Sequence, residues 1–81
     1  MDVLYFAWVR ERIGQPRERV ETGAVTVRDL VEELRAREAR YAAAFEDLGA
    51  LRVAVDQELA DFDAPLAEAR EVAFFPPMTG G

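Results

Sequence analysis

One strongly amphipathic segment near the middle of the chain constrains the fold, because the segments on either side of it must cover its apolar face. Thr26 followed by Asp29 resembles a helix capping box, although Asp replaces the preferred Glu or Gln. The residues after Thr26 predict a helix over about 27–37 with a charged, solvent-exposed outer face. Its apolar residues recur at helical spacing and share one face: Val27, Leu30, Val31 and Leu34.

Two strands are predicted before this helix. Residues 3–9 are rich in β-branched and aromatic types on both alternating sets, which is typical of an inner strand. After the turn signal Gly14-Gln15-Pro16, residues 17–21 predict a charged strand that suits the edge of a sheet.

The segments after the helix predict a return to the sheet. Residues 41–48 favour a short helical piece closed by Gly49. Alternation then predicts strands at 51–55, 59–62 and 71–75, the last ended by two prolines that cannot donate to a ladder. The pattern predicts an α+β fold of β-β-α-β-β order, with one main helix across a mixed sheet of four to five strands. Residues 1–75 would form one domain, and residues 76–81 a flexible C-terminal tail.

The composition fits one small domain. Eighty-one residues, 51% of them apolar, support a single core of limited size. The chain has no cysteine, which fits a reducing cytoplasm, and no apolar run long enough to cross a bilayer. The N-terminus lacks the pattern of a secretory leader. We therefore expect a cytoplasmic protein with no membrane partner.

The residue types that are missing argue against free-standing catalysis. The chain contains no His, Cys, Ser, Lys or Asn, so most nucleophiles and near-neutral bases are absent. Paired carboxylates could still support a hydrolase or a hard-cation site. The best acidic cluster lacks the spacing of a calcium-binding loop, so we interpret it as a solvated turn and expect no metal. This cluster consists of Asp56, Glu58, Asp61 and Asp63.

The charge balance indicates the kind of partner. Ten arginines against sixteen acids give a net charge of -6, which repels phosphate backbones and disfavours nucleic-acid binding. An acidic domain suits a basic protein partner, although the charge also fits simple solubility.

The last residues of the sequence, Gly80 and Gly81, suggest a chemical handle. Glycine has no Cβ, so the pair could thread a narrow channel and place a carboxylate at its far end, and Pro76 and Pro77 would stiffen the approach. An extended tail from Pro76 to Gly81 would reach about 20 Å at roughly 3.3 Å per residue. A frayed end remains the alternative from these residues alone.

Three segments of the chain resemble the MoaD-type sulfur carriers, the small subunits of molybdopterin synthase within the ubiquitin-like β-grasp family. The terminal FFPPMTGG is the most specific, residues 6–14 look like the family's F-A-x-x-R-E-x-x-G stretch, and residues 55–66 resemble its V-N-x-x-x-x-x-x-D-x-P-L segment. Two departures concern turns: Asp56 replaces a usual Asn, and Glu68-Ala69-Arg70 replaces a usual Asp-Gly-Asp.

The resemblance implies a mechanism. An ATP-dependent adenylating enzyme would join the Gly81 carboxylate to AMP, and a sulfur donor would displace AMP to leave a thiocarboxylate. The sulfur would then attack cyclic pyranopterin phosphate in the large synthase subunit and build the dithiolene of molybdopterin. The chain would hold no permanent cofactor, only a transient acyl-AMP. The catalytic residues would lie in the large subunit, within an expected heterotetramer.

The resemblance also implies site residues. Gly81 would bear the acyl group, Gly80 would keep the entry slender, and Pro76, Pro77, Met78 and Thr79 would line the inserted arm. The candidates for the docking surface, with core packing as the alternative for the apolar ones, are Phe6, Arg10, Leu59 and Phe75. Trp8 has the same ambiguity. A carrier for thiamine synthesis or tRNA thiolation, a ubiquitin-like modifier and a plain β-grasp binding module remain alternatives.

Overall fold

The computed structural model describes residues 1–77 of the chain. The predicted site residues Met78, Thr79, Gly80 and Gly81 lie outside the described residues. The elements in chain order are β1 (Asp2–Tyr5), α1 (Ala7–Ile13), β2 (Arg17–Arg19), α2 (Val27–Arg37), α3 (Ala39–Ala44), the 3-10 turn η1 (Leu48–Ala50), β3 (Arg52–Val55), β4 (Glu58–Ala60) and β5 (Glu71–Phe75).

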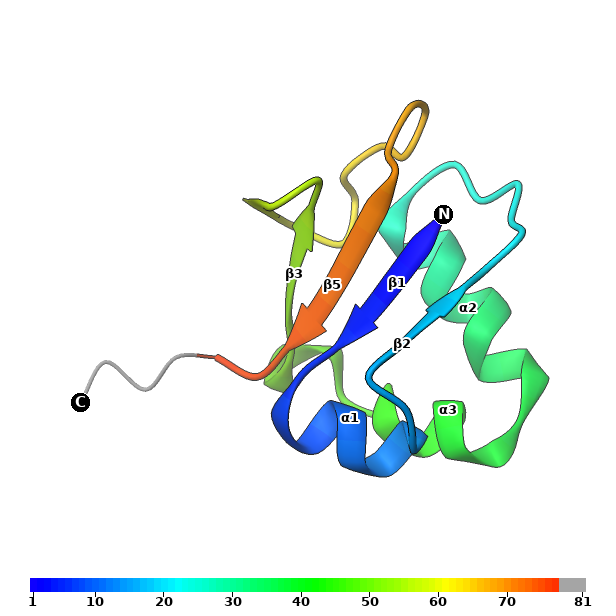
Figure 1. Cartoon of the computed structure of the whole chain (residues 1–81), viewed down its shortest axis with the longest axis vertical. Helices are drawn as coiled ribbons and strands as arrows, with labels where there is room; N and C mark the ends of the chain where they lie inside the picture. The colour runs from blue at the N-terminus through cyan, green and yellow to red at the C-terminus, as the bar shows by residue number, and fades with distance from the viewer. Residues whose placement is uncertain (78–81) are drawn as a thin grey trace.

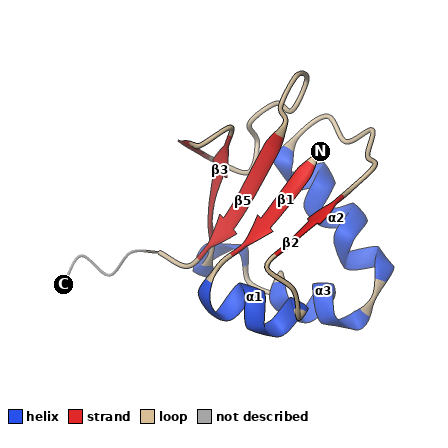
Figure 2. Ribbon diagram, in the orientation of Figure 1, coloured by secondary structure: helices blue, strands red, loops and turns tan. Residues whose placement is uncertain are grey.

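The five strands form one mixed sheet in the order β2-β1-β5-β3-β4 (Figure 1). The first and last strands of the chain, β1 and β5, pair in parallel at the centre, and the other neighbours are antiparallel. The sequence prediction of an inner first strand and a charged edge strand is confirmed. Figure 2 shows the helices behind and below the strands, so that one face of the sheet carries no helix.

The predicted helix is confirmed with the bounds that its sequence indicated. Thr26 Oγ1 accepts a hydrogen bond from the Asp29 amide, and an Asp29 carboxylate oxygen accepts one from the Thr26 amide, both at 3.2 Å. Asp therefore replaces Glu in a complete capping box. The four apolar residues of α2 are fully buried against the sheet.

The first predicted strand is wrong beyond Tyr5. The backbone turns at Ala7, whose φ is +52°, and continues as helix α1 to Gly14 at φ +94°. Val9 and Ile13 are buried four residues apart, so the helical period applies here rather than alternation. The run of apolar residues from Phe6 to Val9 concealed this change of period.

The prediction for residues 41–48 is correct in type and wrong in extent. Helix α3 ends at Ala44, with Phe45 as its C-cap. Gly49 does not close this helix but lies in η1, where its amide donates to Asp47 Oδ1 at 3.0 Å. The predicted strands at 17–21 and 59–62 are shorter in the structure, as β2 and β4.

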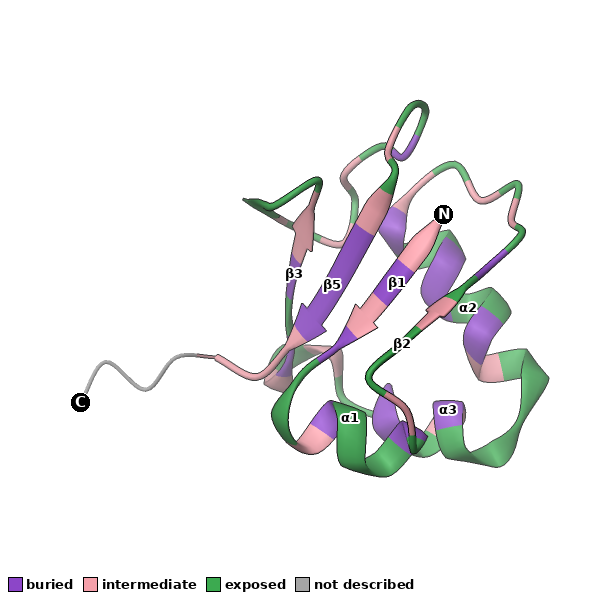
Figure 3. Ribbon diagram, viewed as in Figure 1, coloured by how far each residue is buried: buried purple, intermediate pink, exposed green. Residues whose placement is uncertain are grey.

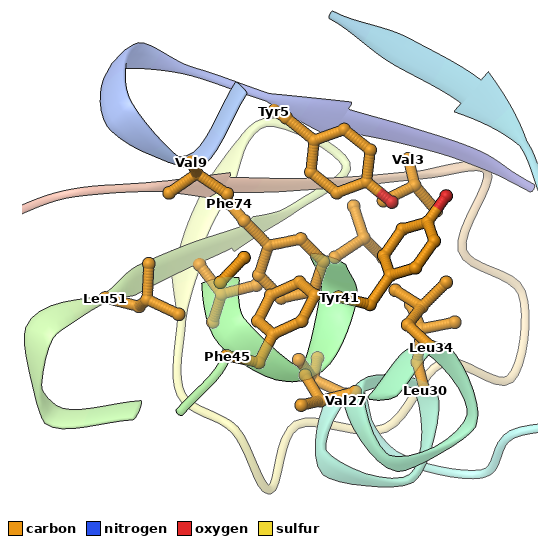
Figure 4. Close-up of a cluster of buried hydrophobic side chains, with 14 of the residues drawn as sticks. Val3, Tyr5, Val9, Val27, Leu30, Leu34, Tyr41, Phe45, Leu51 and Phe74 are labelled. Atoms are coloured by element: carbon orange, nitrogen blue, oxygen red, sulfur yellow. The ribbon is translucent and has the colours of Figure 1, made fainter. Parts of the chain in front are cut away.

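The core lies between the sheet and the helices (Figure 3). Tyr5, Phe45 and Phe74 form its aromatic centre, with Phe74 stacked near Tyr5 and in edge contact with Phe45 at 4.9 Å between ring centroids (Figure 4). All three side chains are almost completely excluded from solvent. Among residues 1–77, no helix has the length and apolar character needed to cross a membrane.

Candidate functional site

Strand β5 fixes the point from which the C-terminal segment leaves the sheet. It lies between β1 and β3, and it pairs with β1 over residues 71–74 and with β3 over residues 72–75. Phe74 is buried, and Phe75, Pro76 and Pro77 are half-buried. We call these last three residues the tail root. Because β5 is the central strand, the tail root stands on the most firmly paired part of the sheet.

Strand alternation determines which side chains face away from the helices. Val3 and Tyr5 of β1, Val53 of β3, and Val72 and Phe74 of β5 are buried on the helix-covered side. Successive strand residues point to opposite faces, so their neighbours lie on the open face. Strand pairing places one row of these neighbours side by side: Leu4, Ala73, Ala54 and Leu59.

A second row crosses the same face at the tail root. Phe6 keeps an extended backbone, with φ -125° and ψ 154°, and its amide donates to the Phe74 carbonyl at 3.1 Å. It therefore continues β1 beside Phe75, and Arg52 is the direct partner of Phe75 on β3. We call the two rows together the open-face surface, in which Ala73 is itself buried among its neighbours. Its residues are Leu4, Phe6, Arg52, Ala54, Leu59, Ala73 and Phe75.

The candidate docking residues differ in exposure. Leu59 is 74% exposed and Phe6 is 44% exposed, so neither packs in the core. Phe75 is half-buried beside them. Exposed large apolar side chains on a small domain are typical of a surface that a partner covers.

Arg10 and Trp8 lie on α1, outside the two rows. Arg10 is exposed one helical turn after Phe6, whose carbonyl accepts a hydrogen bond from the Arg10 amide at 3.4 Å. Trp8 is half-buried, and the Arg12 guanidinium lies 5.2 Å from its ring centroid. Trp8 packs against the core and therefore contributes mainly to packing.

Sequence reasoning did not name Leu4, Arg52, Ala54 and Ala73 as parts of this surface. Two alanines and one leucine carry no chemical signal of their own. The sequence does show that residues alternate within β1, β3 and β5. Which of the alternate residues face away from the helices, however, follows only from the strand order and register.

The acidic turn has a structural role at the other end of the sheet. Asp56 and Gln57, at φ +49° and +70°, form the two-residue turn between β3 and β4. Asp56 Oδ1 accepts hydrogen bonds from the amides of Arg70 and Glu71, at 2.9 and 3.0 Å. The two departures from the family pattern therefore contact each other. Among residues 1–77, no group of three or more acids is arranged to hold a metal ion.

The fold and the site define a class of protein: a ubiquitin-like β-grasp domain with an apolar open face and a C-terminal segment leaving from its central strand. The chain belongs to the ThiS family, whose model matches residues 3–81. This match, together with the named relatives that follow, confirms the family resemblance drawn from the sequence.

Two relatives share the name molybdopterin synthase sulfur carrier subunit. The Escherichia coli K12 protein is 48% identical over 79 residues, covering 98% of this chain and 96% of its own. The Mycobacterium tuberculosis protein is 35% identical, covering 100% and 96%.

Solved structures show the same fold. SAMP1 from Haloferax volcanii superposes with a TM-score of 0.78 at 28% identity, covering 100% of this chain and 98% of that one. A Pyrococcus furiosus protein described as molybdopterin converting factor, subunit 1, gives 0.74 at 29% identity, covering 95% of each chain.

Proposed function

We propose that this chain is the sulfur carrier subunit of molybdopterin synthase in molybdenum cofactor biosynthesis. The observation that carries this proposal is the near full-length similarity to relatives that bear this name, at up to 48% identity. The absence of His, Cys, Ser and Lys from the sequence supports a carrier whose chemistry resides at its terminus.

The first step of the proposed mechanism activates Gly81. A carboxylate is ionised at neutral pH, with a reference pKa of about 3.5, and as an anion it resists attack by a nucleophile. An ATP-dependent adenylating enzyme would convert it to an acyl-AMP with release of pyrophosphate. A donor that supplies sulfur at the sulfide level would then form the C–S bond as the C–O bond to AMP breaks, releasing AMP and leaving a thiocarboxylate. Because the step consumes ATP, we place it in the cytoplasm.

The second step delivers the sulfur. The thiocarboxylate would enter the active site of the large subunit and attack cyclic pyranopterin phosphate, which would link Gly81 to the substrate as a thioester. Water would then cleave the acyl C–S bond, leaving the sulfur on the substrate and returning Gly81 to a carboxylate, and two such deliveries would complete the dithiolene of molybdopterin. Gly80, Thr79, Met78 and the two prolines would form the inserted arm. The catalytic residues would belong to the large subunit, which explains how this chain can function without bases of its own.

The open-face surface is our candidate for docking the large subunit. Phe6 offers exposed apolar area beside the half-buried Phe75 of the tail root, Leu59 adds exposed apolar area on β4, and Arg10 is exposed on α1. Aromatic and arginine anchors dominate protein interfaces. Docking here would hold the partner at the point from which the arm leaves. We expect a heterotetramer of two large and two small subunits.

Intact-mass analysis tests the carrier function. The chain would be incubated with its adenylating enzyme, ATP and a sulfur donor, with a Gly81-deleted variant as the matched control. We expect a mass gain equal to one oxygen replaced by sulfur, confined to a C-terminal peptide and absent from the control. An unchanged mass in the full chain would contradict the proposal. Recovery of Gly81 in branched peptides on target lysines would support the ubiquitin-like modifier instead.

A further inference from the structure

Arg52 is the one charged residue among the seven residues of the open-face surface. The next residue along the first row is Arg17 on β2, the direct partner of Leu4, and its charge is paired with Asp2. Arg52 opens β3 and pairs across the sheet with Phe75, the first residue of the tail root. Its side chain therefore lies on the open face with Phe75 as its direct neighbour, and it is exposed. A cation here stands at the edge of an apolar surface, next to the origin of the tail.

The guanidinium of Arg52 is held by backbone groups. Its Nη1 donates to the Leu51 carbonyl at 2.8 Å and to the Gly49 carbonyl at 3.3 Å. Gly49 lies in η1 and Leu51 is the C-cap residue of this turn, whose N-terminus is capped by Asp47. Because one nitrogen is anchored, the planar group keeps its direction and its other donors remain available in a fixed fork.

Five of the ten arginines form no ion pair within residues 1–77, and Arg52 shares this state with Arg10, Arg12, Arg19 and Arg70. The other five form ion pairs with nearby acids: Arg17, Arg28, Arg35, Arg37 and Arg40. Within residues 1–77, no such pair includes Arg52, although the chain carries sixteen acids. Its charge is thus not neutralised by the described part of its own domain.

A partner that covers the open-face surface must supply groups that compensate the charge of Arg52. Removing an ionised group from water is costly unless an opposite charge and hydrogen bonds replace the water. A guanidinium with free donors in a planar fork matches the two oxygens of a carboxylate. The geometry therefore selects for an acidic side chain on the partner, opposite Arg52.

We infer that Arg52 pairs with a carboxylate of the large synthase subunit, placed at the mouth of the site that receives the tail. This inference rests on the proposed function and adds a specificity residue to it. The phosphate of a Gly81 adenylate is a poorer candidate, because six residues follow Phe75 and could carry that group up to about 20 Å away at roughly 3.3 Å per residue. The pair would fix the register of docking and so direct the tail into its channel.

Titration calorimetry of the full chain with the purified large subunit tests the inference. Arg52→Ala should weaken binding about tenfold, as expected for loss of a charge-assisted hydrogen bond, and Arg52→Glu should weaken it further. Arg52→Lys should retain part of the affinity because it keeps the charge. Raising the salt concentration should weaken the wild-type complex more than the Arg52→Ala complex.

Arg35→Ala is the matched control, because it removes the same charge from helix α2, in the layer on the other side of the sheet. It should bind within about twofold of wild type, and melting curves should show all variants folded. Two results for Arg52→Ala would overturn the inference while leaving the proposed function intact. One is wild-type affinity for the large subunit, and the other is a loss of affinity for the adenylating enzyme with no loss for the large subunit. No binding by the wild-type chain would instead contradict both.

Discussion

At the scale of single residues, Glu18 organises the polar contacts at the edge of the core. The hydroxyls of Tyr5 and Tyr41 both donate to Glu18 Oε2, the former at 2.8 Å, and Arg37 lies 3.7 Å from Oε1. These contacts join β1, β2, α2 and α3 through one carboxylate. Burial, followed by the hydrogen bond to Glu18, raises the pKa of both tyrosine hydroxyls above the ordinary value of about 10.

These raised pKa values predict a loss of stability at high pH. Below about pH 10 the tyrosines are neutral in both the folded and the unfolded chain, and their ionisation does not affect folding. Above it the unfolded chain loses the protons first, so the free energy of unfolding should fall by up to about 1.4 kcal/mol per pH unit for each tyrosine. Urea unfolding at pH values from about 8 to about 11 would measure this fall in the free energy of unfolding, because the range spans the reference tyrosine pKa of about 10.

Tyr5→Phe provides the control for this prediction. It should be about 1 kcal/mol less stable than wild type at pH 8 because it lacks the hydrogen bond. Its stability should then fall less steeply with pH than that of wild type. If the free energy of unfolding fell equally steeply with pH in both proteins, the pKa of Tyr5 would not be raised by folding, and the prediction would be wrong.

At the scale of elements, α2 depends on its capping box. Thr26→Ala removes the acceptor for the Asp29 amide and should cost about 1 kcal/mol, which corresponds to roughly 4–8 °C in Tm for a domain of this size. Thr26→Ser retains a hydroxyl and should stay near wild type. Thermal melting of the three proteins measures the effect, and a Thr26→Ala variant as stable as Thr26→Ser would show that the cap contributes nothing.

Elements whose signal is local were predictable from the sequence. The period and cap of α2 defined that helix, and Pro76 ended β5 where expected. Helix α1 was missed because Phe6, Ala7, Trp8 and Val9 are all apolar and fit either period. Gly14, in the left-handed conformation that ends the helix, was the one local signal of it.

The candidate site was only partly predictable for a different reason. Phe6, Leu59 and Phe75 could be named from their types, but their gathering on one face depends on the parallel pairing of β1 with β5 and on the register of β3. Arg52 joins them only through that register. Contacts between distant segments are not encoded in any local pattern.

At the scale of the whole molecule, the residues that stabilise the fold and the residues that we assign to docking and sulfur transfer lie in different parts of the domain. The helices and one sheet face form the core, the other face presents apolar side chains, and the central strand leads to the tail root. A partner that docks on the open face therefore meets the origin of the tail. In this account the domain positions Gly81, and the partners supply the bases and phosphate-binding groups.

The most direct test of the central claim is a single-turnover reaction of the purified Gly81 thiocarboxylate with the large subunit and cyclic pyranopterin phosphate, with no other sulfur source. We expect molybdopterin to form and two thiocarboxylates to return to carboxylates for each dithiolene, as measured by intact mass and product analysis. Product formed equally well from a Gly81-deleted chain, or a thiocarboxylate left unconsumed, would contradict it.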